Sequence, residues 1–317
     1  MNTKNQSPAE SNSSRGADDD SRIVSPCPVC GGAPRSLYTI DRFEKPFDIL
    51  RCPDCALQMQ ATIPEDASEL YDEDYYTGRA EYSYRDEREQ RRFDRYVLDA
   101  RLRTIARYAA PPADFVDVGA AFGAFVEAAQ AAGYRARGLD VSEYAAADAR
   151  SRGLDVRVGE LIPGAFEPAS VDVLTMIEVF EHLTQPRAAM RALRESMRPG
   201  GLVVVQTANF RGAQARRAGG DYHYYLPGHF YYYSSDNLRR LFAEFGFSRV
   251  KIFRPVDFAL LAKLKKSRGG FTRARDYLGW LRIAWYHWKG MLHFGEYALT
   301  SSMVLYAWRD ADDAQPR

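Results

Sequence analysis

Residues 115–140, FVDVGAAFGAFVEAAQAAGYRARGLD, constrain the fold more than any other stretch of this 317-residue chain. Phe115–Val118 is short and mostly apolar, which is typical of a buried strand, and a turn with two glycines follows it. The apolar spacing after the turn predicts a helix that ends at Gly133, and residues 136–139 predict a second strand that leads into Asp140. This order of elements predicts a doubly wound α/β sheet.

The second predicted strand ends in an acid, Asp140, which lies 21 residues beyond Gly119. In a doubly wound sheet such an acid can accept both hydroxyl hydrogens of a ribose, while the first turn faces the same ligand. A dinucleotide-binding fold would use these parts too. However, Ala121 stands where the dinucleotide fingerprint has its middle glycine, and Asp117 is poorly placed beside a pyrophosphate. The carboxylate of Asp117 favours a cationic ligand instead.

The motif Asp117-Val-Gly119-Ala-Ala121-Phe-Gly123 resembles the first motif of the class I S-adenosylmethionine-dependent methyltransferases, an acid and an apolar residue followed by glycine-x-glycine-x-glycine. Ala121 is the one departure inside it. The resemblance covers roughly residues 115–254 and a last strand near the C-terminus. It implies a mostly parallel, seven-stranded Rossmann-like sheet whose last strand runs antiparallel, with S-adenosylmethionine as the cofactor.

The same resemblance implies positions for the cofactor. The backbone of the glycine turn would line its methionine end, Asp117 would serve its ammonium group through water, and Asp140 would bind its ribose. Glu160 is the candidate residue near the adenine. It is equally open that Glu160 is an ordinary exposed acid in a loop. The predicted cofactor-binding residues are Asp117, Gly119, Ala121, Gly123, Asp140, Glu160 and Ile177.

The four cysteines form two pairs, Cys27-Pro-Val-Cys30 and Cys52-Pro-Asp-Cys55. Each CxxC turn aims two thiolates at one point, and two turns supply the closed tetrahedral four-sulfur shell of a structural zinc. We therefore predict that these cysteines bind Zn²⁺ in a small module that needs its metal to fold. Two disulfides, four unrelated thiols and a rubredoxin-like iron site are the alternatives. Because the chain starts without a secretion signal, we expect a reducing compartment.

The segment Ile177-Glu178-Val-Phe-Glu181-His182-Leu183 resembles the ExxEH element of small-molecule methyltransferases, including the ubiquinone-biosynthesis O-methyltransferases. A histidine here could accept a hydroxyl proton from the acceptor, since its ordinary pKa suits neutral pH. Glu178 and Glu181 could orient His182 or join it around a divalent metal, and Glu178 is also a candidate substrate contact. In the alternative interpretation the segment only shapes the cofactor pocket and caps a helix.

Residues 220–235, GDYHYYLPGHFYYYSS, place six tyrosines and two histidines after the fifth predicted strand. Open α/β sheets bind substrate at this edge, and aromatic rings suit a sugar, an aromatic or a lipid-linked acceptor. Tyr225 and His229 are the candidate substrate contacts, and His229 joins His182 and Glu181 as a catalytic candidate. It is equally open that these tyrosines pack against the hydrophobic core and do not contact a substrate.

Residues 258–294 form an insert between the last two predicted strands that contains three of the four tryptophans and a single acid, Asp276. We expect it to be helical. Leu281, Trp285 and Trp288 would pack it onto the core or a second subunit. The alternatives are contact with an anionic membrane surface or with nucleic acid. Its cations are Lys263, Lys265, Lys266, Arg268, Arg273, Arg275, Arg282 and Lys289.

The chain is expected to divide into four parts. These are a disordered polar tail at 1–22, a zinc-ribbon-like module at 23–62, a connecting lid and helix at 63–112, and a class I methyltransferase domain at 113–317 that carries the insert. Further strands are expected at 156–158, 171–176, 202–206, 250–253 and 302–308, with helices at 86–110, from 186 to about 199, and at 236–245.

Four features together resemble the bacterial zinc-ribbon-bearing class I methyltransferases, a group often linked to surface-polysaccharide or secondary-metabolite pathways. They are the zinc-ribbon pattern, the tyrosine-rich connection, the glycine motif and the HFYYYS segment at 229–234. We therefore predict a cytoplasmic enzyme that methylates a hydroxyl of a small sugar-like or lipid-linked acceptor, with peripheral contact at the inner membrane face through 258–294 left open. The net charge of +1 gives no general attraction to nucleic acid or to an anionic membrane. A nucleic-acid methyltransferase and a noncatalytic cofactor-binding protein are the alternatives.

Overall fold

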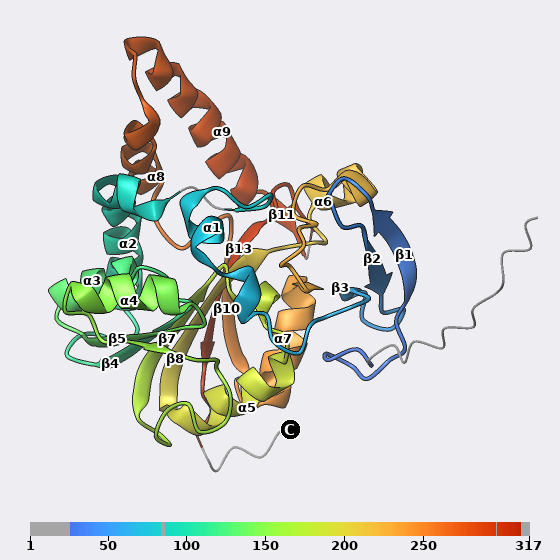
Figure 1. Cartoon of the computed structure of the whole chain (residues 1–317), viewed down its shortest axis with the longest axis horizontal. Helices are drawn as coiled ribbons and strands as arrows, with labels where there is room; N and C mark the ends of the chain where they lie inside the picture. Colours follow the sequence, from blue (N-terminus) through green and yellow to red (C-terminus); the bar gives the residue numbers. More distant parts are fainter. Residues whose placement is uncertain (1–25, 84–85, 296, 312–317) are drawn as a thin grey trace, which may run out of the picture.

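The computed structural model describes residues 26–83, 86–295 and 297–311. The predicted tail at 1–22 lies outside the described residues. A central seven-stranded sheet runs through the molecule in the order β10-β13-β8-β7-β4-β5-β6 (Figure 1). Its strands are β4 (Asp114–Val118), β5 (Arg135–Asp140), β6 (Val156–Val158), β7 (Val171–Ile177), β8 (Met197–Ala208), β10 (Arg249–Phe253) and β13 (Ser302–Trp308).

Five neighbouring strands of this sheet, β8, β7, β4, β5 and β6, run parallel. The last strand, β13, pairs antiparallel with both β8 and β10. The predicted mostly parallel, doubly wound sheet with an antiparallel last strand is therefore confirmed.

Successive residues of the central strands face two separate cores, because side chains alternate across a sheet. On β8, Val203 and Val205 belong to one core, whereas Leu202 and Val204 belong to the other. Helices α2, α3 and α4 contribute to the second core, and α5 and α7 to the first. The helices are α2 (Arg91–Ile105), α3 (Ala124–Ala131), α4 (Glu143–Ser151), α5 (Pro186–Ser196) and α7 (Ser235–Glu244).

Local signals explain several helix ends. Ser142 caps α4 by accepting the Ala145 N–H, and Ser234 forms a capping box with Asn237 at the start of α7. Two predicted boundaries differ from the structure. A 3-10 turn, Glu87–Gln90, precedes α2, so the regular helix is shorter than 86–110. Helix α5 ends at Ser196, and β8 already begins at Met197 and passes through the Pro-Gly-Gly sequence that we expected to end the helix.

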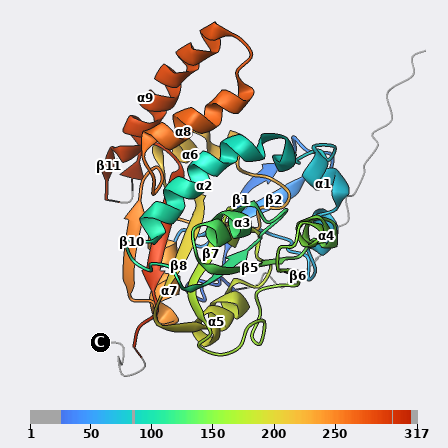
Figure 2. The same ribbon diagram turned by 90° about the vertical axis from the view of Figure 1, so that its left-hand side faces the viewer.

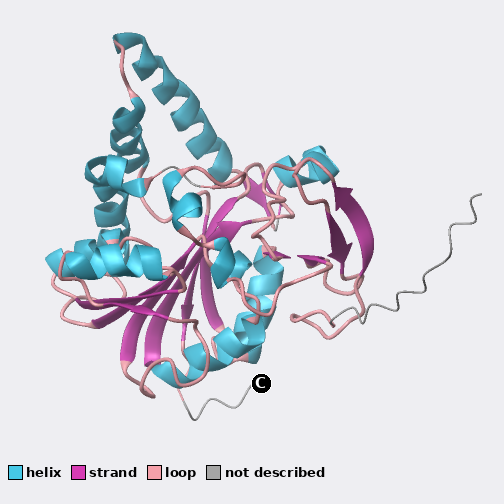
Figure 3. Cartoon of the chain, in the orientation of Figure 1, coloured by secondary structure: helices cyan, strands magenta, loops and turns pink. Residues whose placement is uncertain are grey.

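The N-terminal cysteine-bearing region forms a second, antiparallel sheet at one side of the molecule (Figure 3). It contains β1 (Arg35–Ile40), β2 (Phe47–Arg51) and β3 (Gln58–Gln60). A distant strand, β9 (Tyr231–Tyr232), pairs with β3 and completes this sheet. The side-chain amide of Gln60 also donates to the carbonyls of Leu226 and Pro227, each at 2.9 Å. The cysteine-bearing region is thereby joined to the loop that follows β8.

The basic aromatic insert forms a helical hairpin of α8 (Leu260–Ser267) and α9 (Gly279–Met291), as expected. It stands out from the rest of the molecule in both views (Figures 1 and 2). At its base, α8 packs against α2. The smaller elements are α1 (Glu73–Thr77), α6 (Ala213–Ala218), β11 (His293–Phe294) and β12 (Tyr297–Ala298). Within the described ranges, every helix is too short or too polar to cross a bilayer.

Candidate functional site

A cavity of about 780 Å³ opens where the parallel strands end. Gly119 after β4, Asp140 at the end of β5 and Ile177 at the end of β7 all line it. Open α/β sheets bind their ligands at the carboxyl ends of the strands, and a cavity of this size is typical of a small-molecule site.

The turn after β4 keeps the shape that a glycine motif requires. Gly119, Ala121 and Gly123 all have positive φ, at 71°, 45° and 74°. A Cβ at Gly119 would collide with Val179, and one at Gly123 would lie 2.7 Å from Leu154 Cδ1. Ala121 adopts the left-handed conformation at a cost of about 1–2 kcal/mol for a residue with a Cβ. The one departure from the motif therefore leaves the turn intact.

Asp140 is held in a fixed orientation at the cavity wall. Its Oδ2 accepts the Ala121 N–H at 2.7 Å, and its Oδ1 accepts the Ser142 N–H at 2.8 Å. The Tyr76 hydroxyl also donates to Oδ1, at 3.3 Å. Burial raises the pKa of Asp140 above its ordinary value, and the two backbone N–H groups oppose that shift. The carboxylate is thus positioned to accept hydrogen bonds from a ligand in the cavity.

The tyrosine-rich segment before α2 covers part of the cavity. Tyr71, Tyr75 and Tyr76 line it. The Tyr76 ring packs edge-on against Phe122 of the glycine turn, with ring centroids 5.3 Å apart. The Tyr71 hydroxyl lies 2.9 Å from His182 Nδ1. One short segment therefore touches both the predicted cofactor turn and the predicted catalytic histidine.

Asp117 lies beneath the cavity wall rather than in it. Its side chain is buried, and the Thr175 hydroxyl donates to its Oδ1 at 2.5 Å. Burial raises the pKa of Asp117 to about 7. Gly123 is also outside the lining, whereas Ala121, Glu160 and Ile177 are part of it. Five of the seven predicted cofactor residues therefore face the cavity.

Asp117→Asn is expected to change how stability depends on pH. The folded-state pKa of about 7 lies above the ordinary value of 3.8, so folding favours the protonated carboxyl. This contribution to stability is present at low pH and is lost as the pH rises towards 7 and beyond. The variant keeps an acceptor for Thr175 without titrating. Its free energy of unfolding should therefore rise by about 4 kcal/mol relative to wild type between pH 4 and pH 8.

Urea unfolding of both proteins across this pH range measures the difference. If the free energy of unfolding depended on pH in the same way in wild type and Asp117→Asn, this result would contradict the raised pKa of Asp117.

His182 follows β7 on a 3-10 turn, Phe180–His182, and lines the cavity. Its Nδ1 lies 2.8 Å from the Gly228 carbonyl oxygen. A carbonyl only accepts, so Nδ1 carries the proton and Nε2 keeps a lone pair. Burial lowers the pKa of His182 to about 4, which keeps the ring neutral near pH 7.

Glu181 and His229 lie together behind His182. The His182 and His229 rings are perpendicular, with centroids 4.5 Å apart. Glu181 is 2% exposed, and neither of its carboxylate oxygens has a hydrogen-bond partner among the residues described. Burial and the Glu178 carboxylate raise the pKa of Glu181 well above its ordinary value. Ligand atoms of Glu181, His182 and His229 all lie within 4.8 Å of one another, a spacing that could hold a metal ion.

Glu178 interacts with Glu181 but is not part of this set of possible metal ligands. It lines the cavity in a strained left-handed conformation, φ 57°, and accepts a hydrogen bond from the Gln206 side chain. Such strain recurs at functional sites, where the surrounding structure maintains it. The possible metal ligands in the structure are therefore Glu181, His182 and His229. The sequence suggested Glu178 in place of His229.

A buried network beside Glu178 escaped sequence analysis. Arg101, only 2% exposed, donates from Nε to Asp257 Oδ1 at 3.1 Å and from Nη2 to Gln206. The Tyr306 hydroxyl donates to Asp257 Oδ2 at 2.7 Å. Arg101 is one of many arginines on a charged helix, and its partners come from strands or loops far along the chain. No spacing in the sequence connects them.

Tyr225 is not where its predicted role requires. It is buried outside the cavity lining, its hydroxyl donates to Gln58 Oε1 at 2.6 Å, and its ring packs against Phe210 and Tyr232. The neighbouring Tyr224 lines the cavity instead. Aromatic composition located the loop, but it could not tell which ring would turn towards the core.

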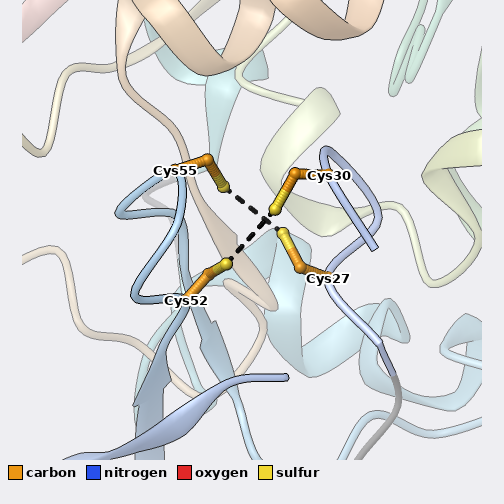
Figure 4. A group of neighbouring side chains, drawn as sticks. All are labelled: Cys27, Cys30, Cys52 and Cys55. Atoms are coloured by element: carbon orange, nitrogen blue, oxygen red, sulfur yellow. Dashed lines mark hydrogen bonds between the residues drawn. The ribbon is translucent and has the colours of Figure 1, made fainter. Parts of the chain in front are cut away.

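The four cysteines converge on one point (Figure 4). The Sγ atoms of Cys27 and Cys55 are 3.5 Å apart, and those of Cys30 and Cys52 are 3.3 Å apart. A tetrahedral zinc with Zn–S bonds of about 2.3 Å requires sulfur atoms about 3.8 Å apart. All four are free thiols in the structure, and the donor set fits a structural zinc.

The methyltransferase-domain family model matches residues 88–252, slightly more than half of the chain. The ubiquinone biosynthesis O-methyltransferase of Cupriavidus pinatubonensis is 38% identical over 101 residues, which cover 30% of this chain and 41% of that protein. The corresponding protein of Paraburkholderia xenovorans is 35% identical over 101 residues, which cover 30% and 44%. The matched region is therefore less than half of the length of these curated relatives.

Among solved structures, an S-adenosylmethionine-dependent methyltransferase from Archaeoglobus fulgidus has a TM-score of 0.48 and 16% identity, and covers 69% of this chain and 97% of that one. A possible histamine N-methyltransferase from Thermotoga maritima has a TM-score of 0.44 and 17% identity, with 69% and 95% coverage.

Proposed function

Because the chain belongs to the S-adenosylmethionine-dependent methyltransferase family, we propose that it transfers the cofactor's methyl group to a hydroxyl oxygen of a small-molecule acceptor. The partial likeness to ubiquinone biosynthesis O-methyltransferases supports oxygen as the attacking atom. A cavity of about 780 Å³ suits a cofactor with a small acceptor better than a nucleic-acid strand. A sugar-like or lipid-linked acceptor remains the proposed class, and the cytoplasm the proposed compartment.

The residues of the first turn and of β5 would hold the cofactor. The backbone at Gly119 and Ala121 borders the cavity, and the Asp140 carboxylate is available there for ribose hydroxyls. When bound, S-adenosylmethionine supplies an electrophilic methyl group on a sulfonium. Tyr71, Tyr75 and Tyr76 would limit the access of water and so help to hold the acceptor against the methyl carbon.

The observation that carries this proposal is the state of His182 at the cavity wall. The Gly228 carbonyl fixes the proton on Nδ1, so Nε2 can act as a base. As the acceptor oxygen forms the new carbon–oxygen bond and the carbon–sulfur bond breaks, the hydroxyl proton would pass to Nε2. The electron pair of the broken bond leaves with the sulfur. Glu181 and His229, both buried behind the ring, would keep His182 in place.

His182→Gln is expected to lower kcat about a hundredfold or more, because positioned bases contribute about 10²–10⁴ to rate. Affinity for S-adenosylmethionine should stay close to wild type. Transfer of a radiolabelled methyl group to a panel of phenols, nucleotide sugars and polyprenyl-linked sugars provides the assay. Since the pKa of His182 is about 4, the acidic limb of the wild-type kcat/KM profile should lie below pH 5.

His223→Gln is the matched control, since His223 is an exposed histidine of the segment that also contains Gly228, and it does not line the cavity. Unchanged turnover of His182→Gln would rule out the base. Metal binding is the second candidate role for the cluster of Glu181, His182 and His229. Loss of the methyl-transfer rate with EDTA and its recovery with Mg²⁺ or Zn²⁺ would support that role instead.

We also propose that Cys27, Cys30, Cys52 and Cys55 hold a structural Zn²⁺ in the module at 23–62. Four sulfur ligands leave no open coordination position, so such a metal would stabilise the fold without taking part in methyl transfer. The division of the chain into this module, a connecting lid and helix at 63–112 and a catalytic domain at 113–317 is part of the same proposal.

A further inference from the structure

Helix α9 has its apolar face on the outside. Leu278, Leu281, Trp285, Trp288 and Leu292 are spaced three and four residues apart, so they form one stripe along the helix. They are 69%, 73%, 67%, 58% and 61% exposed. Packing of Leu281, Trp285 and Trp288 onto the core, one of the interpretations of the sequence, is therefore not what the structure shows.

The side of α9 that is covered carries smaller or more polar groups. His287 and Gly290 are its buried residues. A Cβ at Gly290 would lie 2.7 Å from Pro255, so the helix is packed closely against the body of the molecule there. A helix that buries glycine and histidine while exposing two tryptophans and three leucines is arranged for contact with something outside this chain.

Positive charge accompanies the stripe. Arg282 and Lys289 lie beside it on the helix, and neither forms an ion pair with any residue the structure describes. Arg268, Arg273 and Arg275, near the tip of the hairpin, are exposed. The sequence from 277 to 295 contains no aspartate or glutamate. Any partner of this face must accept both apolar contact and cations.

We propose that the outward face of α9, Leu278 to Leu292, docks on the surface of an anionic lipid bilayer. Tryptophan is suited to the boundary between hydrocarbon and headgroups, and arginine and lysine are attracted to anionic headgroups. The 13 residues of α9 extend about 20 Å, less than the roughly 30 Å of a bilayer's hydrocarbon core. The helix would therefore lie in the membrane–water interface, with its apolar stripe inserted into the lipid.

The hairpin also connects this surface to the cavity. Phe258, Lys263 and Tyr286 belong to the insert and line the cavity. In the views of Figures 1 and 2 the hairpin projects beyond the rest of the molecule, with α8 packed against α2, and the exposed apolar side chains of α9 belong to this projecting part. Docking would bring the cavity close to the lipid surface, where a lipid-linked acceptor could reach it. This last step rests on the proposed function, whereas docking itself does not.

Vesicle flotation of the full chain tests the proposal without any acceptor. We expect association with vesicles that contain phosphatidylglycerol, and about tenfold weaker association with pure phosphatidylcholine. Replacement of Trp285 and Trp288 together by serine should weaken binding to the anionic vesicles at least about tenfold. Because both side chains are exposed, the variant should keep the wild-type melting temperature and affinity for S-adenosylmethionine.

Val158→Ser is the matched control, because Val158 is an exposed apolar side chain, 44% accessible, on the distant strand β6. It should bind vesicles as wild type does. Arg282→Glu should weaken binding more at low salt than at high salt, since it removes only the electrostatic part.

Two results would overturn the proposal. One is no difference between wild type and the double serine variant on anionic vesicles. The other is a lipid-free dimer, seen by sedimentation, that the same variant dissociates; the occupant of the stripe would then be a second copy of the chain. A failure of methyl transfer with intact vesicle binding would count against the proposed function alone.

Discussion

Asp140→Ala is expected to weaken S-adenosylmethionine binding about a hundredfold or more. The carboxylate would accept two ribose hydroxyls, and hydrogen bonds to a charged group contribute about 1.5–3 kcal/mol each. A loss of about 1.4 kcal/mol corresponds to a tenfold change in affinity. The substitution also leaves the N–H groups of Ala121 and Ser142 without their acceptor, so the turn that faces the cofactor loses part of its support. Titration calorimetry measures the loss.

Two further variants separate binding from folding. Glu143→Ala removes an exposed carboxylate three residues away, one that pairs with Arg150 and does not line the cavity, and it should bind the cofactor normally. Asp140→Asn keeps one side-chain oxygen and should fall between wild type and the alanine variant. Wild-type affinity in a folded Asp140→Ala protein, or preference for NADH over S-adenosylmethionine, would refute the cofactor assignment.

Removal of zinc, or Cys52→Ser, is expected to unfold the cysteine-bearing region and to lower stability by about 5 kcal/mol. Cys52 is fully buried, and its neighbours Leu57 and Met59 belong to the same core as Phe230 and Tyr233. The damage should therefore extend beyond the small sheet and loosen the loop after β8. Thermal unfolding and circular dichroism, with and without a chelator, measure both effects.

The metal content provides the control for this prediction. The intact protein should contain one zinc per chain, and addition of Zn²⁺ should restore the chelated wild type but not Cys52→Ser. A metal-free protein with full stability, or thiols that prove to be paired as disulfides, would contradict the zinc site.

Local patterns were sufficient for the elements that form the glycine-turn side of the cavity. The strand, glycine turn and helix after Phe115 depend on neighbouring residues, and β13 occupies 302–308 as predicted. The CxxC pairs likewise predicted the convergence of four sulfur atoms. Ala121 shows the limit of motif reading, because only the structure shows that it adopts the left-handed conformation of the glycine it replaces.

Contacts between distant segments decided the rest. Tyr224 lines the cavity and Tyr225 does not, because Tyr225 instead donates to Gln58 of β3 and packs against other buried aromatic rings. Arg101 of α2 meets Asp257 only because the connection between β10 and α8 packs against that helix. The sequence by itself determined the doubly wound sheet, the glycine turn and the cysteine cluster, since short-range spacing encodes them. Tertiary structure decided which face of α9 is covered, because periodicity shows which residues share a face but not what lies against it.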